Sequence, residues 1–432
     1  MKTILLSFAL LWATNQASAQ SLTDITQSNM KGAHGLVGFA TLPAYQMDGI
    51  TGGAMGQLVI AENEEQLRAY CQAEQPYTIL FEGEISRTDE VDIAVASNKT
   101  IIGCNGRASL NGIGFEGENV SNIIIRGFRI TNAHCDAIAF KTSHHIWIDH
   151  CDLSASDDGL LDMTVGSDLM TASWNRFANH NKTSIINSGT QHPEDKGKER
   201  ISYHHNHFTN TKQRNPRVGY GLGHLWNNLY EGIRSYCIGY FDGARLRVEN
   251  SCFKNCKTPF QQMYVQDPNN EHFGHCEQLN NIFIGCKGNM EGTGSSFDVA
   301  DYYDYSLTME ATEQVADIVE KGAGVVKGLE YDLIPIPNSG TIQNRSTLSR
   351  LQWSKAPQAK KYLVYGSSSA ELLQSLPAGD KRLKPLLIGK TKQSDCKLKQ
   401  SVQNGETYYW RVDTQLKGRT IQGKVWSFRV AK

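Results

Sequence analysis

Short apolar segments that end in a polar residue recur along the middle of the chain. From about residue 120, β-branched or aromatic runs end in one polar position and continue into a large apolar residue, as in "IIIRGFRI", "IWIDHCDL", "TASWNRF" and "HLWNNLY". The shared position falls at Phe128, Cys151, Asn175, Asn206, Asn228, Ser251 and Asn281. The intervals are 23, 24, 31, 22, 23 and 30 residues. This spacing predicts the coils of a parallel β-helix, with loops in the two longer coils.

Asparagine occupies four of the seven shared positions. Amides stacked about 4.8 Å apart can donate and accept hydrogen bonds from coil to coil. The pattern therefore predicts an asparagine ladder, and the alternative is a chance recurrence of Asn in turns.

The pattern changes near residue 336. Residues 336–348, "IPNSGTIQNRSTL", contain proline, glycine and serine without apolar periodicity and are interpreted as a linker. Alternating segments such as "TYYWRVDTQL" and "KVWSFRV" then predict a small antiparallel β-sandwich over 349–432. Its aromatic residues, Trp353, Trp410 and Trp426 among them, favour a packed core over a sugar-binding face. We therefore expect an all-β protein with a right-handed parallel β-helix over 20–335.

Composition and the N-terminus indicate an exported protein. Residues 1–19 have a basic second residue, an apolar run and a small-residue end, which predicts a cleaved signal peptide. No later apolar run reaches the roughly 20 residues of a membrane span. A net charge of -1 gives no general attraction to nucleic acid. We expect a secreted monomer that is extracellular, periplasmic or on the cell surface, whose ten cysteines form either disulfides or buried thiols.

Acidic and basic residues recur at one phase of four consecutive coils. Asp136, Asp158, Lys182 and Arg214 follow their markers by 8, 7, 7 and 8 residues. Asp162 shares the outward parity of Asp158 because Leu161 and Met163 alternate inward. Three neighbouring carboxylates suit a hard divalent cation such as Ca²⁺, and the alternative is a solvated acidic patch. With a lysine and an arginine beside them, the acids favour a carboxylated sugar polymer as the ligand.

The motifs "WIDHC", "DGLLD" with "GSD", "HNK" and "QRNPR" occur in this order, and with them residues 34–300 resemble the pectate lyases of polysaccharide lyase family 1. The resemblance implies that Asp136, Asp158 and Asp162 are Ca²⁺ ligands. It also implies that Lys182 binds a substrate carboxylate and that Arg214 is the catalytic base. The implied reaction is β-elimination on α-1,4-polygalacturonate, which gives 4,5-unsaturated products. Because a guanidinium is protonated at ordinary pH, we expect an alkaline optimum.

The sequence departs from the resemblance at two positions. Many members have a second arginine where this chain has Gly219, so one carboxylate contact is in doubt, and Arg217 is the substitute that we expect to bind substrate. His134 stands where some members have a further aspartate near the metal. The segment after the linker resembles the fibronectin type III-like modules of bacterial carbohydrate enzymes.

Three other functions fit the sequence less well. A polygalacturonase needs two carboxylates around a water and a Gly-His-Gly element, whereas Gly223 and His224 are followed by Leu225. A pectin lyase would lack the acidic cluster. A non-catalytic β-helix adhesin or binding protein would not explain the alignment of Lys182 with Arg214.

Overall fold

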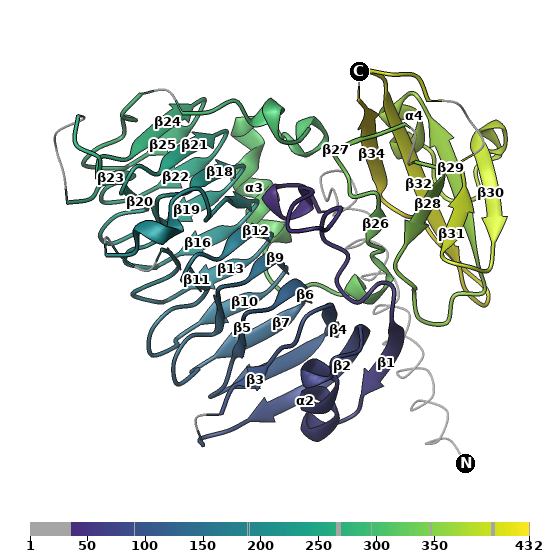
Figure 1. Ribbon diagram of the computed structural model, residues 1–432, viewed down its shortest axis with the longest axis horizontal. Coiled ribbons are helices and arrows are strands. Elements are labelled where there is room, and N and C mark those ends of the chain that lie inside the picture. Colours follow the sequence, from purple (N-terminus) through teal and green to yellow (C-terminus); the bar gives the residue numbers. More distant parts are fainter. Residues whose placement is uncertain are drawn as a thin grey trace, which may run out of the picture.

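The computed structural model describes residues 36–89, 91–187, 189, 191–264, 269–294, 296–345, 348–398 and 402–431. The expected signal peptide, residues 1–19, lies outside the described residues. The described chain forms a parallel β-helix of about nine turns, followed by a smaller β region beside it (Figure 1). The predicted fold class is confirmed.

Two parallel sheets form the walls of the helix, and the larger one contains two stacks of strands. The larger sheet has 17 strands, namely β1 (Gln57–Ala61), β2 (Tyr77–Ser86), β4 (Lys99–Asn111), β6 (Ser121–Arg126), β7 (Phe128–Thr131), β9 (His144–Asp149), β10 (Asp152–Ser154), β12 (Asp168–Ser173), β13 (Arg176–Ala178), β15 (Ile201–His204), β16 (His207–Thr209), β18 (Leu222–Trp226), β19 (Leu229–Glu231), β21 (Arg245–Glu249), β22 (Cys252–Lys254), β24 (His275–Leu279) and β25 (Ile282–Ile284). The smaller sheet has eight, namely β3 (Ile93–Ala94), β5 (Phe115–Glu118), β8 (Ile138–Lys141), β11 (Asp162–Thr164), β14 (Ile185–Ile186), β17 (Arg217–Gly219), β20 (Ile238–Phe241) and β23 (Phe260–Gln262).

The seven shared positions lie in register, as predicted. The residues that follow them pair from coil to coil, beginning with Arg129, Asp152 and Arg176. The asparagine ladder is also confirmed. The Oδ1 atom of Asn206 accepts the backbone N–H of Asn175 at 3.0 Å, and Oδ1 of Asn228 accepts that of Asn206 at 2.9 Å.

Aromatic side chains stack inside the helix because each coil places one residue at the same interior position. Phe177, Phe208, Tyr230, Phe253 and Phe283 follow one another with ring centroids 4.5 to 5.1 Å apart. All but Phe283 are fully buried. Backbone pairing of the parallel strands sets the separation of successive coils, so the residues on the outer face repeat at the same spacing as these rings.

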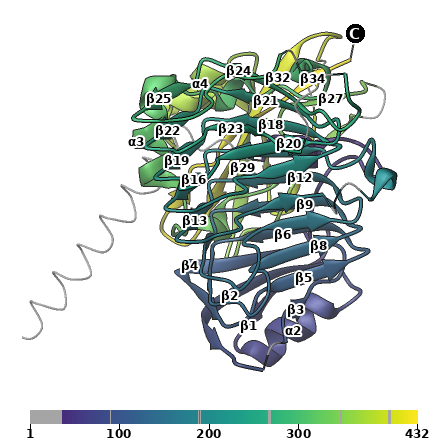
Figure 2. The same ribbon diagram turned by 90° about the vertical axis from the view of Figure 1, so that its left-hand side faces the viewer.

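Two helices cover apolar surface of the β-helix. α2 (Glu64–Gln72) lies across the first coil, where it buries Leu67 and Cys71 in the core (Figure 2). α3 (Thr312–Gly322) packs Val315 and Val319 against the outside of the larger sheet. No described helix has the length and apolar content needed to cross a membrane. All ten cysteines are described and none of them forms a disulfide, so the disulfide alternative is not realised.

The C-terminal region contains two further sheets. One consists of β26 (Pro335–Ile336), β28 (Arg350–Trp353) and β31 (Asp395–Lys397). The other consists of β27 (Thr341–Gln343), β29 (Lys361–Ser367), β30 (Leu387–Thr391), β32 (Thr407–Gln415), β33 (Thr420–Ile421) and β34 (Val425–Val430), with α4 (Ala370–Ser375) beside it. Trp353, Trp410 and Trp426 are buried between strands, so the predicted aromatic core is confirmed.

The segment expected as a linker, 336–348, contributes strands to this region. β27 pairs with β34, and Ile336 pairs with Gln352. A buried ion network then joins the two parts of the chain. The guanidinium of Arg126 contacts the carboxylate of Asp332 at 2.6 Å, and the Nζ atom of Lys424 contacts the same carboxylate at 2.7 Å. The likeness to fibronectin type III-like modules stays a prediction.

Candidate active site

The residues expected at the site lie along one edge of the smaller sheet, where the chain enters its strands. Asp136 precedes β8, Asp158 precedes β11, Lys182 precedes β14 and Arg214 precedes β17, while Asp162 opens β11. The bridge partners of Lys182 are Gly159 and Gln213. Asp158 comes one residue before the partner Gly159, and Arg214 comes one residue after the partner Gln213. The charged residues expected in one straight column are therefore staggered by one residue on each side of Lys182.

Asp136 and Asp162 each use one carboxylate oxygen to hold the next coil. Oδ1 of Asp136 accepts the N–H of Gly159 at 2.5 Å, and Oδ1 of Asp162 accepts the N–H of Ile185 at 2.9 Å. Among the described residues, none donates a hydrogen bond to the second oxygen of either carboxylate.

Burial and the charges of neighbouring acids raise the pKa of Asp136 and of Asp162. Burial is the main cause that raises the pKa of Asp136, and the charge of Asp158 adds to it. Burial also raises the pKa of Asp162 well above its usual range, followed by the charge of Asp136, while the guanidinium of Arg214 opposes the rise. Asp162 therefore lies within reach of the charges of both Asp136 and Arg214.

Lys182 forms an ion pair with one of these acids. Its Nζ atom donates to Oδ1 of Asp158 at 2.7 Å. Both side chains are more than a third exposed, so the pair is worth at most about 1 kcal/mol of stability. Either group can exchange this partner for a charged ligand at little cost.

The turn that carries Arg214 is anchored by the residue after it. Arg214 has a left-handed backbone with φ of 61°. The side chain of Asn215 donates to the carbonyl of Tyr236 at 3.1 Å and accepts from the hydroxyl of Thr211 at 2.8 Å. The carbonyl of Arg214 accepts the N–H of Ser184 at 2.8 Å. These bonds fix the backbone from which the guanidinium projects.

Arg217 is held by two aromatic residues that sequence reasoning missed. Its guanidinium lies 4.6 Å from the ring centroid of Phe241 and 5.3 Å from that of Tyr264, and it donates to the Tyr264 hydroxyl. The Tyr264 side chain is 66% exposed. The coil period could have indicated Phe241, because Arg217 pairs with Gly239 in the next strand and Phe241 lies two residues further along that strand. Nothing local indicated Tyr264.

Gly219 lies against a buried side chain rather than facing open space. A Cβ atom at this position would lie 2.4 Å from Nδ2 of Asn187 and 2.8 Å from its Cγ. Asn187 is itself buried. An arginine in place of Gly219 would therefore have to displace Asn187.

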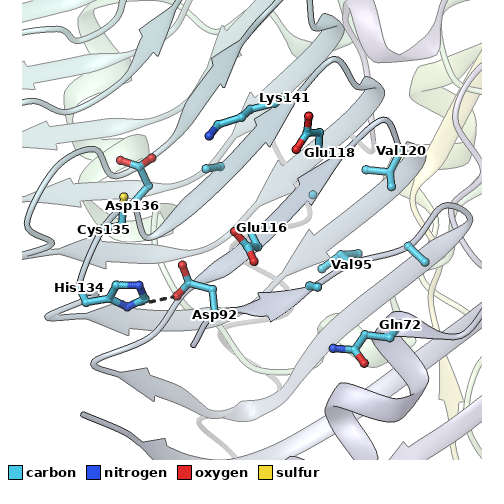
Figure 3. Close-up of a pocket in the computed structure, with 14 residues that line it drawn as sticks. Gln72, Asp92, Val95, Glu116, Glu118, Val120, His134, Cys135, Asp136 and Lys141 are labelled. Carbon is cyan, nitrogen blue, oxygen red and sulfur yellow. Dashed lines mark ion pairs between the residues drawn. The ribbon is translucent and has the colours of Figure 1, made fainter. Parts of the chain in front are cut away.

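A cavity of about 520 Å³ opens beside Asp136 (Figure 3). Its charged lining residues are four acids, Asp92, Glu116, Glu118 and Asp136, and one lysine, Lys141, which pairs with Glu118 on the adjacent strand. His134, the second departure from the resemblance, lies in this cavity with its Nδ1 atom 3.7 Å from Oδ1 of Asp92. Asp92 comes from an earlier coil and was missed in the sequence, because it precedes the first marker.

The donor set of this edge fits a hard divalent cation. Carboxylate oxygens are the ligands such ions prefer, and burial raises the pKa of Asp136 and Asp162 by more than the nearby Lys141 and Arg214 lower it. Among the described residues, no three His, Cys, Asp or Glu side chains are already gathered as a metal site. The ligands would be Asp136, Asp158 and Asp162, once Lys182 has released Asp158.

Comparisons with known proteins agree with this architecture. The sequence model of the pectate lyase family matches residues 36–328. A pectate trisaccharide-lyase of Thermotoga sp. (strain RQ2) is 32% identical over 334 residues, which cover 69% of this chain and 91% of that protein. A pectate trisaccharide-lyase of Bacillus licheniformis is 32% identical over 335 residues, covering 73% and 94%.

A solved structure supports the same assignment. The pectate lyase Bsp165PelA of Bacillus sp. N165, solved in complex with trigalacturonate, is 27% identical with a TM-score of 0.59, and the match covers 67% of this chain and 99% of that one. These findings define a polysaccharide lyase with a parallel β-helix fold. The chain belongs to the pectate lyase family.

Proposed function

We propose that the protein is a secreted, Ca²⁺-dependent pectate lyase that cleaves α-1,4-polygalacturonate by β-elimination. The observation that carries the proposal is the edge of the smaller sheet, where three acids on two coils are followed by Lys182 and Arg214 on the next two coils. The trigalacturonate bound to the Bacillus relative supports a polygalacturonate substrate. The family match supports the reaction class.

Each side chain at this edge has a task in the proposed reaction. Lys182 exchanges Asp158 for the carboxylate of the substrate and stabilises the negative charge that develops there. Arg214, when neutral, accepts the proton from C5 of the sugar. The electron pair of the C5–H bond becomes the C4=C5 double bond. The C4–O bond breaks, and its oxygen leaves with the bonding pair and is protonated by solvent.

Ca²⁺, held by Asp136, Asp158 and Asp162, would supply further positive charge at the substrate carboxylate and so make the C5 proton more acidic. Arg217, fixed against Phe241 and Tyr264, is placed to bind a second carboxylate of the polymer.

The proposal is tested by measuring the ultraviolet absorbance of unsaturated products. We expect activity on polygalacturonate, little on highly esterified pectin, and loss of activity after exhaustive chelation that added Ca²⁺ restores. Asp158→Ala should need more Ca²⁺ for half-maximal rate, because one ligand of several is lost. Asp152→Ala, which removes a carboxylate from the larger sheet, is the matched control and should leave the requirement unchanged. Full activity after chelation would contradict the calcium requirement.

Secretion is tested separately with the leader. Deletion of residues 2–19 should keep the protein inside the producing cells, whereas the full chain should deliver activity outside the cytoplasm. Export of the truncated chain would contradict the signal-peptide assignment.

A further inference from the structure

Three carboxyl groups are buried together at the edge of the smaller sheet opposite to the candidate active site. Asp195 ends the 3-10 helix Pro193–Asp195, Glu199 precedes β15, and Asp242 follows β20. The chain leaves the smaller sheet at this edge, whereas the candidate catalytic residues lie where it enters. The three residues are 1%, 0% and 1% exposed.

These carboxyl groups have few hydrogen-bond donors. Among the described residues, none donates to either oxygen of Asp195, to either oxygen of Glu199, or to Oδ2 of Asp242. Only Oδ1 of Asp242 is paired, with Nδ1 of His272 at 2.6 Å. Glu199 interacts directly with Asp195 and is also within reach of the charge of Asp242. Buried carboxylates without donors are strongly disfavoured, so something must offset their charge.

Two of the nearby basic side chains are engaged elsewhere. Nε of Arg200 donates to both oxygens of Asp168, at 3.0 and 3.2 Å. The Lys196 side chain is 57% exposed and pairs with Glu271 at 3.6 Å. Among the described ion pairs, none joins a lysine or arginine to Asp195 or Glu199.

We propose that Asp195 and Glu199 bind a second Ca²⁺, whose role is to hold the loop of residues 191–200 against the β-helix. Both ligands offer only hard oxygen atoms in an irregular loop, and Ca²⁺ accepts such geometry, completing its six to eight ligands with backbone carbonyls and water. Asp242 adds negative charge beside the ion and remains bonded to His272. The site is separate from the proposed lyase chemistry.

A shared proton is the competing explanation. Burial, followed by the charge of Asp195, raises the pKa of Glu199 to about 10, so this carboxyl holds a proton when no cation is bound. A proton and a Ca²⁺ ion make opposite predictions for an amide in place of Glu199. If a proton is shared, Glu199→Gln imitates the protonated acid and should be tolerated. If Ca²⁺ is bound, the same substitution removes a negative charge from the ligands of the ion and should weaken its binding.

The loop contains its own probe, because Lys196 and Lys198 lie between the two proposed ligands and are trypsin sites. We suggest limited trypsinolysis of the chelator-treated full chain, with and without Ca²⁺, and mass spectrometry of the cut sites. Ca²⁺ at about ten times its Kd should slow cleavage after Lys196 and Lys198 about tenfold, because the opened loop becomes that much rarer. Asp158→Asn should keep this protection, since it alters only the other edge.

Glu199→Gln should lose the protection while its cleavage without Ca²⁺ stays close to that of the parent chain. Asp195→Asn is the second variant and should behave in the same way, so the test does not depend on one substitution. Absence of Ca²⁺ protection in the parent chain would overturn the proposal in favour of the shared proton. Protection that survives in both variants would overturn it by placing the ion elsewhere. Lyase activity is not read in this experiment, so failure of the proposed function leaves its outcome unaffected.

Discussion

Replacing Arg214 and Arg217 separately with lysine tests how the two arginines divide their work. Each substitution keeps a positive charge and alters the shape of the donor group. Lysine tolerates the left-handed backbone of position 214 about as well as arginine does, so the turn anchored by Asn215 should survive. The two variants therefore differ in chemistry rather than in folding.

The structure sets different magnitudes for the two losses. At position 217, lysine weakens the contacts with two aromatic rings and the hydrogen bond to the Tyr264 hydroxyl. Because lysine recovers part of these interactions, the net loss is about 1 to 2 kcal/mol. This corresponds to a KM about 5 to 30 times higher with kcat nearly unchanged. At position 214, loss of the base should lower kcat by about 10² or more, or about 2.7 kcal/mol.

The assay is kcat and KM on polygalacturonate at saturating Ca²⁺, with thermal unfolding to confirm that both variants fold. Tyr264→Phe is a matched control, because it removes only the hydroxyl that Arg217 contacts and should raise KM by part of the Arg217→Lys effect. A larger fall in kcat for Arg217→Lys than for Arg214→Lys would refute the assignment of Arg214 as the base.

Three further predictions concern stability and the departures in sequence. Gly219→Arg should lower the free energy of unfolding by about 1 to 3 kcal/mol in urea titrations, because its Cβ overlaps Asn187, and a lower KM than that of Gly219→Ala would show that the guanidinium still reaches substrate. Asn228→Ala should cost about 2 to 5 kcal/mol, since it removes the acceptor of the Asn206 N–H, one of the two acceptors of Asn206 Nδ2, and a donor to the carbonyl of Tyr203. Asn132→Ala on an exposed turn should cost less than about 1 kcal/mol. Burial by itself would raise the pKa of Glu249, but hydrogen bonds from His224, Tyr305 and Arg247 outweigh it and lower that pKa to about 2, so the ionised form stabilises the fold by about 3 kcal/mol at most. This stabilisation is complete above pH 4.5 and is lost as the pH falls toward 2. In Glu249→Gln the free energy of unfolding should therefore vary less with pH across that window, and an unchanged slope would contradict the argument.

The repeat of the β-helix was readable from sequence because each coil contacts only its neighbours. Phe128, Cys151 and Asn175 mark the register in the sequence alone, and the same arithmetic carries it to Asn281. The residues of the candidate edge could be placed in order for the same reason. Their function as ligand, clamp and base stays a prediction.

Contacts between distant parts of the chain were beyond the sequence. The period could not show that Lys182 aligns with Gly159 or that Tyr264 holds Arg217. Nor could it show that β27, which lies in the segment expected to be a linker, pairs with β34. These depend on loop paths and side-chain rotamers, which no repeat encodes. The burial of Asp195 and Glu199 was hidden in the same way, because the polar segment that contains them resembles an exposed loop until the fold closes over their carboxylates. Local periodicity determined the coil, and packing between non-adjacent segments decided which charges lie together.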